Sequence, residues 1–311
     1  MPNLIHIGLP KTATTTLQNN VFARQPRFTY LGKVQNNYPD HRVRELCTRV
    51  RLQDSLDYDA NTTRSILDEL RAHRDKVGDR RPFLLSEEAF AAEGYADRRL
   101  IAERLHRLFA PAKVLIVLRA QPSLLKSLYM HHLKSSGERP VTFESWLAKH
   151  YGEIRFPGTL RVGLDYENLV RSYEQLFGGD NVVVLAFESI HGETGDFARS
   201  VGELVGLDCD EVRRAFLRSR ENTRMSERHR LALGVQNILP TGANLALAGR
   251  RYLPAKIYEP IRGFVTGGRL IEAAEMPADW LVRLQVLCGS GNAALARRKN
   301  IPLATFGYPL P

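Results

Sequence analysis

The sequence predicts an α/β fold in three layers, with a central parallel sheet flanked by helices, and three observations support this. Short apolar segments of strand length recur along the chain. Segments with helical periodicity separate them, which favours βαβ units and a parallel sheet. The 311 residues are 43% hydrophobic and 25% charged, the balance of a globular protein with a buried core. We therefore expect a single domain over residues 1–311.

The expected elements follow one another in a regular order. Residues 4–8 are apolar, Pro10 and a threonine-rich stretch follow, and residues 17–22 are helical in pattern, so the chain begins as strand, loop and helix. Further strands are expected at 83–85, 114–118 and 182–185, with helices such as 98–109 and 168–177 between them. Residues 222–276 contain several prolines and glycines and are expected to form an irregular insertion or lid. Residues 280–299 are helical in pattern, with an interruption at Gly289 and Gly291.

Cysteine content, hydropathy and net charge indicate where the protein is located and which kinds of partner it binds. Cys47, Cys209 and Cys288 lie far apart without metal-type spacing, so neither a disulfide framework nor a zinc site is expected, and a reducing compartment fits. No apolar run approaches the roughly 20 residues of a membrane span, and the chain enters a strand at once, so we expect a cytoplasmic, unprocessed protein. The formal net charge of +10 favours anionic partners. No nucleic-acid-binding motif is found, while peripheral contact with a lipid surface stays open.

The loop after the first strand has the layout of an anion site. A strand that leads through a loop into a helix directs several backbone N–H groups and the positive end of the helix dipole at one point. Lys11 and the threonines of residues 8–17 add a cation and hydroxyls. A helix capped by threonine, with a surface lysine, is the alternative. The Walker A loop of nucleoside triphosphatases is disfavoured, because Lys11 comes too early and the third strand ends in Arg119 rather than an aspartate.

This loop resembles the 5′-phosphosulfate-binding loop of sulfotransferases that use 3′-phosphoadenosine 5′-phosphosulfate (PAPS). The resemblance implies a P-loop-like fold, PAPS as co-substrate and no metal. Ala13 stands where the family usually has glycine, so we expect the loop to avoid a positive φ at this position. The implied donor-binding residues of the loop are Pro10, Lys11, Thr12, Ala13, Thr14, Thr15 and Thr16.

A second motif of the same family is present further along the chain. Ser127 follows Arg119 by eight positions and Tyr129 follows by two more, behind the apolar segment 114–118. In the family this arginine and serine bind the 3′-phosphate of PAPS, which suits a guanidinium fork and a hydroxyl. Tyr129 is assigned no chemical role. The segments 165–188 and 306–309 resemble bacterial members of the family more weakly.

Transfer of a sulfuryl group needs a base for the acceptor's proton and a positive charge near the leaving phosphate. Lys11 is placed to supply the charge. Glu88, and in second place Glu87, are the expected bases, because the strand 83–85 should end beside the loop and carbohydrate sulfotransferases resemble this placement of a glutamate. Both glutamates could instead only begin a helix. His131 or His132 is the rival assignment.

Three functional hypotheses remain at this point. The first is a PAPS-dependent sulfotransferase acting on a hydroxyl or amine, with a saccharide preferred as acceptor because the expected bases are carboxylates. The second is a P-loop kinase or other phosphotransferase with a different donor. The third is a non-catalytic module that binds polyanions or membranes through the net positive charge and the basic segment near Arg250, Arg251 and Lys256.

Overall fold

The computed structural model describes residues 1–91, 97–135, 141–151, 163–191, 195–218 and 275–311, with three single positions between 254 and 260. The chain divides into two compact units. The first comprises Met1–Gln121, Pro157–Ser219 and Leu281–Pro311, and the second comprises Pro122–Phe156 and Arg220–Trp280. The single domain over 1–311 stays a prediction. Most of the expected insertion at 222–276 lies outside the described residues.

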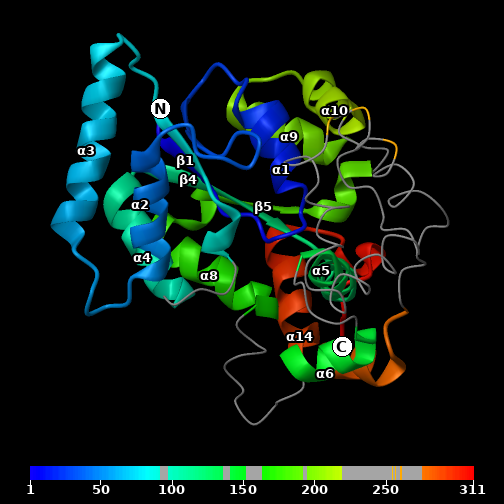
Figure 1. The fold of residues 1–311 in the computed structure, drawn as a ribbon. Coiled ribbons are helices and arrows are strands. Elements are labelled where there is room, and N and C mark those ends of the chain that lie inside the picture. The colour runs from blue at the N-terminus through cyan, green and yellow to red at the C-terminus, as the bar shows by residue number, and fades with distance from the viewer. Residues whose placement is uncertain are drawn as a thin grey trace. The chain divides into compact units, whose positions relative to one another are not determined.

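The first unit is built on a five-stranded parallel sheet (Figure 1). Its strands stand in the order β2-β3-β1-β4-β5, and the register places Ile5 of β1 beside both Leu85 and Val114. The α/β class with a central parallel sheet and flanking helices is therefore confirmed. The strands are β1 (Asn3–His6), β2 (Thr29–Gly32), β3 (Phe83–Ser86), β4 (Ala112–Leu118) and β5 (Val182–Ala186).

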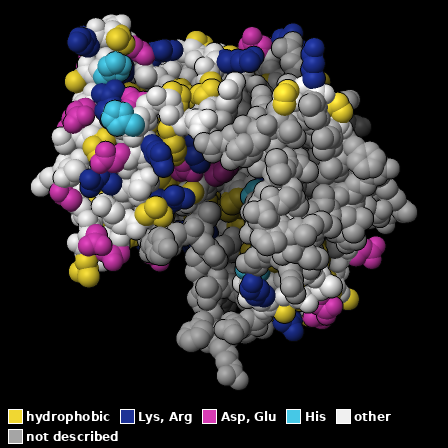
Figure 2. All heavy atoms as spheres, viewed as in Figure 1, with side chains coloured by type: hydrophobic (Ala, Val, Ile, Leu, Met, Phe, Trp, Pro, Cys, Tyr) yellow, Lys and Arg dark blue, Asp and Glu magenta, His cyan; other side chains and the backbone are white. Residues whose placement is uncertain are grey.

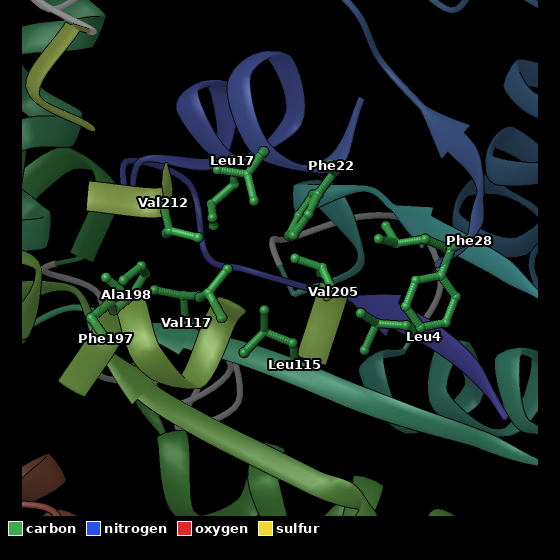
Figure 3. Packing of buried hydrophobic residues seen from close by; sticks show 13 residues of the cluster. Leu4, Leu17, Phe22, Phe28, Leu115, Val117, Phe197, Ala198, Val205 and Val212 are labelled. Atoms are coloured by element: carbon green, nitrogen blue, oxygen red, sulfur yellow. The ribbon is translucent and has the colours of Figure 1, made fainter. Parts of the chain in front are cut away.

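One face of the sheet packs against the first helical segment and two later helices. These are α1 (Thr14–Thr16) with the π-helix η1 (Leu17–Phe22), α9 (Asp196–Val205) and α10 (Cys209–Arg218). Leu115 and Val117 alternate along β4 so that both point to this face. Figure 3 shows them meeting Leu17 of η1 and Val205 of α9 in one apolar cluster. This burial fixes the helix that follows β1 directly over the sheet.

Helices also cover the opposite face. In Figure 1, α2 (His41–Leu52), α4 (Arg98–Phe109) and α8 (Tyr166–Phe177) lie there, with α3 (Ala60–Lys76) packed outside α2. Each of these four helices starts at an aspartate whose carboxylate accepts backbone N–H bonds, the preferred N-cap chemistry. The four caps are Asp40, Asp59, Asp97 and Asp165. The expected helices over 98–109 and 168–177 are confirmed as α4 and α8.

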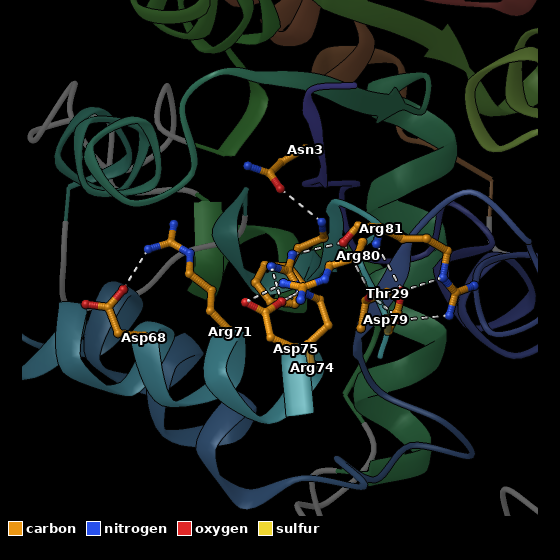
Figure 4. A network of polar contacts seen from close by, with 10 residues as sticks. Asn3, Thr29, Asp68, Arg71, Arg74, Asp75, Asp79, Arg80 and Arg81 are labelled. Atoms are coloured by element: carbon orange, nitrogen blue, oxygen red, sulfur yellow. Dashed lines mark hydrogen bonds and ion pairs between the residues drawn. The ribbon is translucent and has the colours of Figure 1, made fainter. Parts of the chain in front are cut away.

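A network of ion pairs and hydrogen bonds lies at the amino end of β3, away from the loop after β1. Figure 4 shows Arg74, Asp79 and Arg81 around the start of β3. The Arg74 guanidinium carbon lies 4.8 Å from the ring centroid of Phe83, and its Nη1 donates to the Arg81 carbonyl at 2.9 Å. This arginine therefore joins a ring and a backbone carbonyl far from the strand ends that carry the expected site.

Two expectations about elements need correction. β2 was not among the expected strands, because Thr29–Gly32 has no continuous apolar run and ends in glycine. The last long helix, α14 (Ala278–Lys299), runs through Gly289 and Gly291 without a break. A Cβ at Gly289 would lie 3.1 Å from the backbone of Leu310 and Pro311, so this glycine permits close packing of the chain end. The helix hydrogen bonds and this packing outweigh the glycine's modest cost in a helix.

Candidate functional site

The order of the strands brings three of the expected segments to one edge of the sheet. β1 lies between β3 and β4, and all three strands run in the same direction. The loop after β1, the two glutamates after β3 and Arg119 after β4 therefore lie at the carboxyl ends of adjacent strands. The chain leaves β1 toward β2 and β3 and later returns to its other side with β4, which makes this edge a topological switch point. Ligands of open α/β sheets bind at such points.

The loop after β1 contains two residues in the left-handed region. Lys11 has φ 64° and Ala13 has φ 59°. The expectation that Ala13 avoids a positive φ was wrong, because this residue adopts the left-handed conformation, at a cost of about 1 kcal/mol or more for a non-glycine residue. Contacts elsewhere in the loop hold it there.

Side-chain and backbone bonds fix the loop over the sheet. The Thr12 hydroxyl donates to the Leu9 carbonyl at 2.5 Å and lies 3.4 Å from the Thr14 hydroxyl, while the Leu9 N–H donates to the Val117 carbonyl of β4. The N-cap position is Ala13, which has no side-chain acceptor, so a threonine does not cap this helix. Among the expected loop residues, Thr12, Thr14 and Thr16 are buried, whereas Pro10, Lys11, Ala13 and Thr15 are partly exposed.

A buried polar cluster that was not expected from the sequence lies beneath the loop. His6 Nδ1 is 2.9 Å from the Ser86 hydroxyl, which also accepts a bond from the Gln18 amide at 3.1 Å. Burial lowers the pKa of His6 to about 3, so the ring is neutral near pH 7. A Cβ at Gly8 would lie 2.6 Å from His6 Nε2, so this position admits only glycine without rearrangement. The cluster ties the ends of β1, β3 and the first helix together.

Glu87 is engaged in structural contacts on three sides. Its carboxylate is 3.0 Å from Lys33 Nζ and accepts a short hydrogen bond from the Tyr38 hydroxyl. It also accepts from the backbone N–H of Ala89 at 3.0 Å, which caps the 3₁₀ turn η2 (Glu88–Phe90). The side chain is only 4% exposed. Its contacts hold the chain that carries Glu88.

Glu88 instead faces the loop after β1. Its carboxylate interacts with the Thr14 hydroxyl, and Lys33 and Lys11 are close enough to act on it electrostatically. Burial raises the pKa of Glu88, a shift that Glu87 reinforces and the two lysines oppose. A partly desolvated carboxylate with a raised pKa is a stronger base than an exposed one.

Arg119 lies on the other side of the loop. Its Nη1 donates to the Lys11 carbonyl at 2.7 Å, and its guanidinium carbon lies 4.5 Å from the ring centroid of Phe187. The Tyr166 hydroxyl donates to the Arg119 carbonyl at 2.7 Å. Burial lowers the pKa of Arg119, which Glu188 opposes, but a guanidinium stays charged. Its Nε is buried without a hydrogen-bond partner among the described residues, and such a donor suits an anion.

The remaining candidates belong to the second unit and are described by themselves. Ser127 is partly exposed on α5 (Gln121–Ser135). Tyr129 on the same helix is buried, packs on Phe143 and Trp146, and donates to the Val141 carbonyl, which agrees with assigning it no chemical role. The His132 ring lies 6.1 Å from that of Trp146, whereas His131 is exposed.

Charge on the described surface is mixed in sign. Figure 2 shows Lys and Arg side chains interspersed with Asp and Glu over the coloured part of this face. Within the parts of the chain that the structure describes, no three His, Cys, Asp or Glu side chains are grouped so as to hold a metal ion. Among the same residues, no helix has the length and apolar composition needed to cross a membrane.

Comparison with known proteins finds solved structures of similar fold, sulfotransferases among them. No family model and no curated protein matches the chain. A sulfotransferase from Alicyclobacillus acidocaldarius is 19% identical with a TM-score of 0.47, covering 83% of this chain and 99% of its own. The sulfotransferase domain of the curacin biosynthetic pathway is 13% identical with a TM-score of 0.39, covering 67% and 75%.

A mouse sulfotransferase, SULT7A1 complexed with 3′-phosphoadenosine 5′-phosphate (PAP), is 12% identical with a TM-score of 0.42, covering 85% of this chain and 84% of its own. All three TM-scores lie below 0.5 and all three identities below 20%. These likenesses concern the arrangement of helices and strands alone.

Proposed function

We propose that the protein transfers a sulfuryl group from PAPS to an acceptor hydroxyl or amine. The observation that carries the proposal is the meeting of the loop after β1, Glu88 and Arg119 at the carboxyl ends of adjacent strands. The helix N-terminus and Lys11 provide positive charge, Glu88 provides a base, and Arg119 provides a buried donor. This set matches the needs of transfer between two oxygen atoms.

In this proposal each residue has one task. The loop's N–H groups and Lys11 hold the 5′-phosphosulfate and stabilise the charge that develops on the phosphate oxygen as the S–O bond to it breaks. Glu88 takes the proton of the acceptor hydroxyl while the acceptor oxygen forms the new bond to sulfur. Arg119, through donors not bound to Lys11, binds the 3′-phosphate, with Ser127 as its partner on the strength of the motif spacing.

The acceptor class is the finer part of the proposal. A saccharide hydroxyl is favoured because the residue at the loop is a carboxylate, which can also accept hydrogen bonds from neighbouring hydroxyls of a sugar. A phosphotransferase is disfavoured because β4 is followed by Arg119 rather than by a carboxylate that would hold Mg²⁺.

Nucleotide affinity tests the donor directly. We expect isothermal titration calorimetry to give much tighter binding of PAP than of AMP or ATP with Mg²⁺, because only PAP carries a 3′-phosphate for Arg119. A charge-assisted contact of this kind contributes about 1.5–3 kcal/mol, or roughly ten- to a hundredfold in affinity. Equal affinities for the three nucleotides would contradict the donor assignment, and tighter ATP binding would favour the phosphotransferase.

Replacement of Lys11 tests the chemistry. We expect Lys11→Ala to lower kcat for transfer of labelled sulfate from PAPS by about 10²–10³-fold, the usual effect of removing one group that stabilises developing charge. Lys113→Ala is the matched control, because Lys113 is exposed on β4 beside Leu4, at the opposite end of the sheet. Near-normal turnover of Lys11→Ala would mean that the loop has only a structural role at the start of the helix.

A further inference from the structure

We infer that Arg119 is a positioning residue for the loop after β1, in addition to the anion contact proposed above. Its guanidinium clamps the backbone of Lys11 in the left-handed conformation that the 5′-phosphosulfate site requires. The inference rests on the proposed function for the loop's role as a 5′-phosphate site. The clamp itself is a property of the protein without nucleotide.

The backbone of the loop after β1 adopts a conformation that surrounding contacts must stabilise. Lys11 at φ 64° and Ala13 at φ 59° are both non-glycine residues in a region that L-residues adopt at a cost. Two such residues separated by one position persist only where the surroundings determine the backbone. The bonds of Thr12 and Leu9 fix the first half of the loop, and neither of them involves Lys11.

Arg119 makes a direct hydrogen bond to this backbone. Arg119 Nη1 donates to the carbonyl of Lys11, the residue whose φ is positive, at 2.7 Å. That carbonyl belongs to the peptide between Lys11 and Thr12, so the bond fixes its orientation. A charged donor in a partly buried setting makes one of the stronger hydrogen bonds available in a protein.

Arg119 is itself fixed by contacts with other parts of the first unit. Its side chain stacks on Phe187, and its carbonyl accepts the Tyr166 hydroxyl. The next N–H, that of Ala120, donates to Glu188 at 3.0 Å. Segments far apart in the sequence thus fix the arginine before it contacts the loop, and a clamp requires such a fixed base.

Arg74 provides a matched control within the same unit. It also stacks on a phenylalanine ring and donates through Nη1 to a backbone carbonyl, at the amino end of β3. Arg74→Ala therefore removes the same two kinds of contact as Arg119→Ala, together with the ion pair to Asp75, but leaves the loop alone. Comparing the two separates a local effect on the loop from a general loss of stability.

The decisive experiment is hydrogen–deuterium exchange on the nucleotide-free protein. We expect amides of residues 9–17 to exchange at least about tenfold faster in Arg119→Ala, and also in Arg119→Lys, whose ammonium lacks the planar fork. Arg74→Ala should leave exchange in this segment unchanged. Arg119→Lys keeps the charge and serves as the test protein if Arg119→Ala does not fold. Unchanged exchange in the Arg119 variants would overturn the clamp, whatever nucleotide the protein binds.

Nucleotide titration adds an independent readout. A clamp predicts that Arg119→Ala weakens AMP as well as PAP by about tenfold or more, because both need the loop. Adding Ala13→Gly, which removes one strained residue, should then restore affinity for both by about fivefold. If Arg119→Ala lowers the affinity for PAP alone, the arginine is only a 3′-phosphate ligand and the clamp is wrong. A wild-type protein that binds neither nucleotide contradicts the proposed function, and the exchange result still decides the clamp.

Discussion

Glu87 and Glu88 are adjacent in the sequence, yet their environments give them different tasks. The Glu87 carboxylate turns toward Lys33 and Tyr38 and caps the following turn, so its acceptors are already used. Glu88 turns toward Thr14 and the loop after β1. Since the backbone between them is extended at Glu87, with φ −147° and ψ 114°, successive side chains point in different directions. The pair thus consists of one anchor and one candidate base.

Glu88→Gln tests this division of roles. The amide keeps the shape of the side chain but cannot take a proton, so we expect kcat to fall by about 10²–10⁴-fold with little change in PAP affinity. Because burial raises the pKa of Glu88, the acidic limb of the wild-type pH–rate profile should lie above the usual glutamate range. Activity then rises with pH as the carboxyl ionises, and this limb should disappear in the variant.

Glu87→Gln is the matched control for that experiment. Its main effect should be on stability, because Lys33 loses its ion-pair partner while Tyr38 keeps only a weaker acceptor, so the melting temperature should fall. If Glu87→Gln loses kcat while Glu88→Gln stays active, Glu87 is the base and Glu88 is the structural residue. If both remain active, the base lies elsewhere, with His131 and His132 next to be replaced.

The residues proposed to carry the chemistry were chosen from the sequence, whereas the residues that support them were not. Lys11, Glu88 and Arg119 were singled out because each follows an apolar strand. His6 was not, because its partners Ser86 and Gln18 are distant in the sequence and only the strand order brings them together. Lys33 was also not predicted, because it follows β2, a strand without a continuous apolar run.

At the scale of elements, hydrophobic pattern determined most of what could be predicted. Four of the five strands were found because parallel strands buried on both faces are continuous apolar runs. α14 shows the limit of local rules, because Gly289 is a helix breaker by propensity but a packing site in three dimensions.

At the scale of the whole molecule, the net charge of +10 says less about function than the placement of a few charges does. Many basic side chains pair with acidic ones, as Arg298 of α14 does with Glu167 and Glu174 of α8. Such pairs neutralise the surface locally and contribute little to long-range attraction. The cations that define the candidate site, Lys11 and Arg119, owe their importance to the sheet edge where they lie.

The end of the chain supports that same edge. Tyr308 is buried, its ring meets that of Tyr166 edge-on, and its hydroxyl lies 3.3 Å from Glu188. Glu188 in turn accepts the N–H of Ala120, directly after Arg119. The Pro309 carbonyl accepts a bond from the Asn292 amide of α14 at 2.8 Å. Tyr308 therefore contacts Glu188, which in turn binds the residue directly after Arg119.

Tyr308→Ala tests whether this support reaches the site. Loss of a buried aromatic side chain should lower the free energy of unfolding by about 3–5 kcal/mol, whereas Tyr308→Phe, which loses only the hydroxyl, should cost about 1 kcal/mol. Because the Glu188 contact holds the turn after Arg119, PAP affinity should also fall severalfold in Tyr308→Ala, measured by calorimetry at a temperature where the variant is folded. Thr305→Ala, at an exposed position in the same terminal segment, should change neither quantity appreciably. A Tyr308→Ala protein that is less stable but binds PAP normally would mean that Tyr308 contributes only packing, and that Arg119 is held without it by Phe187, Tyr166 and Glu188.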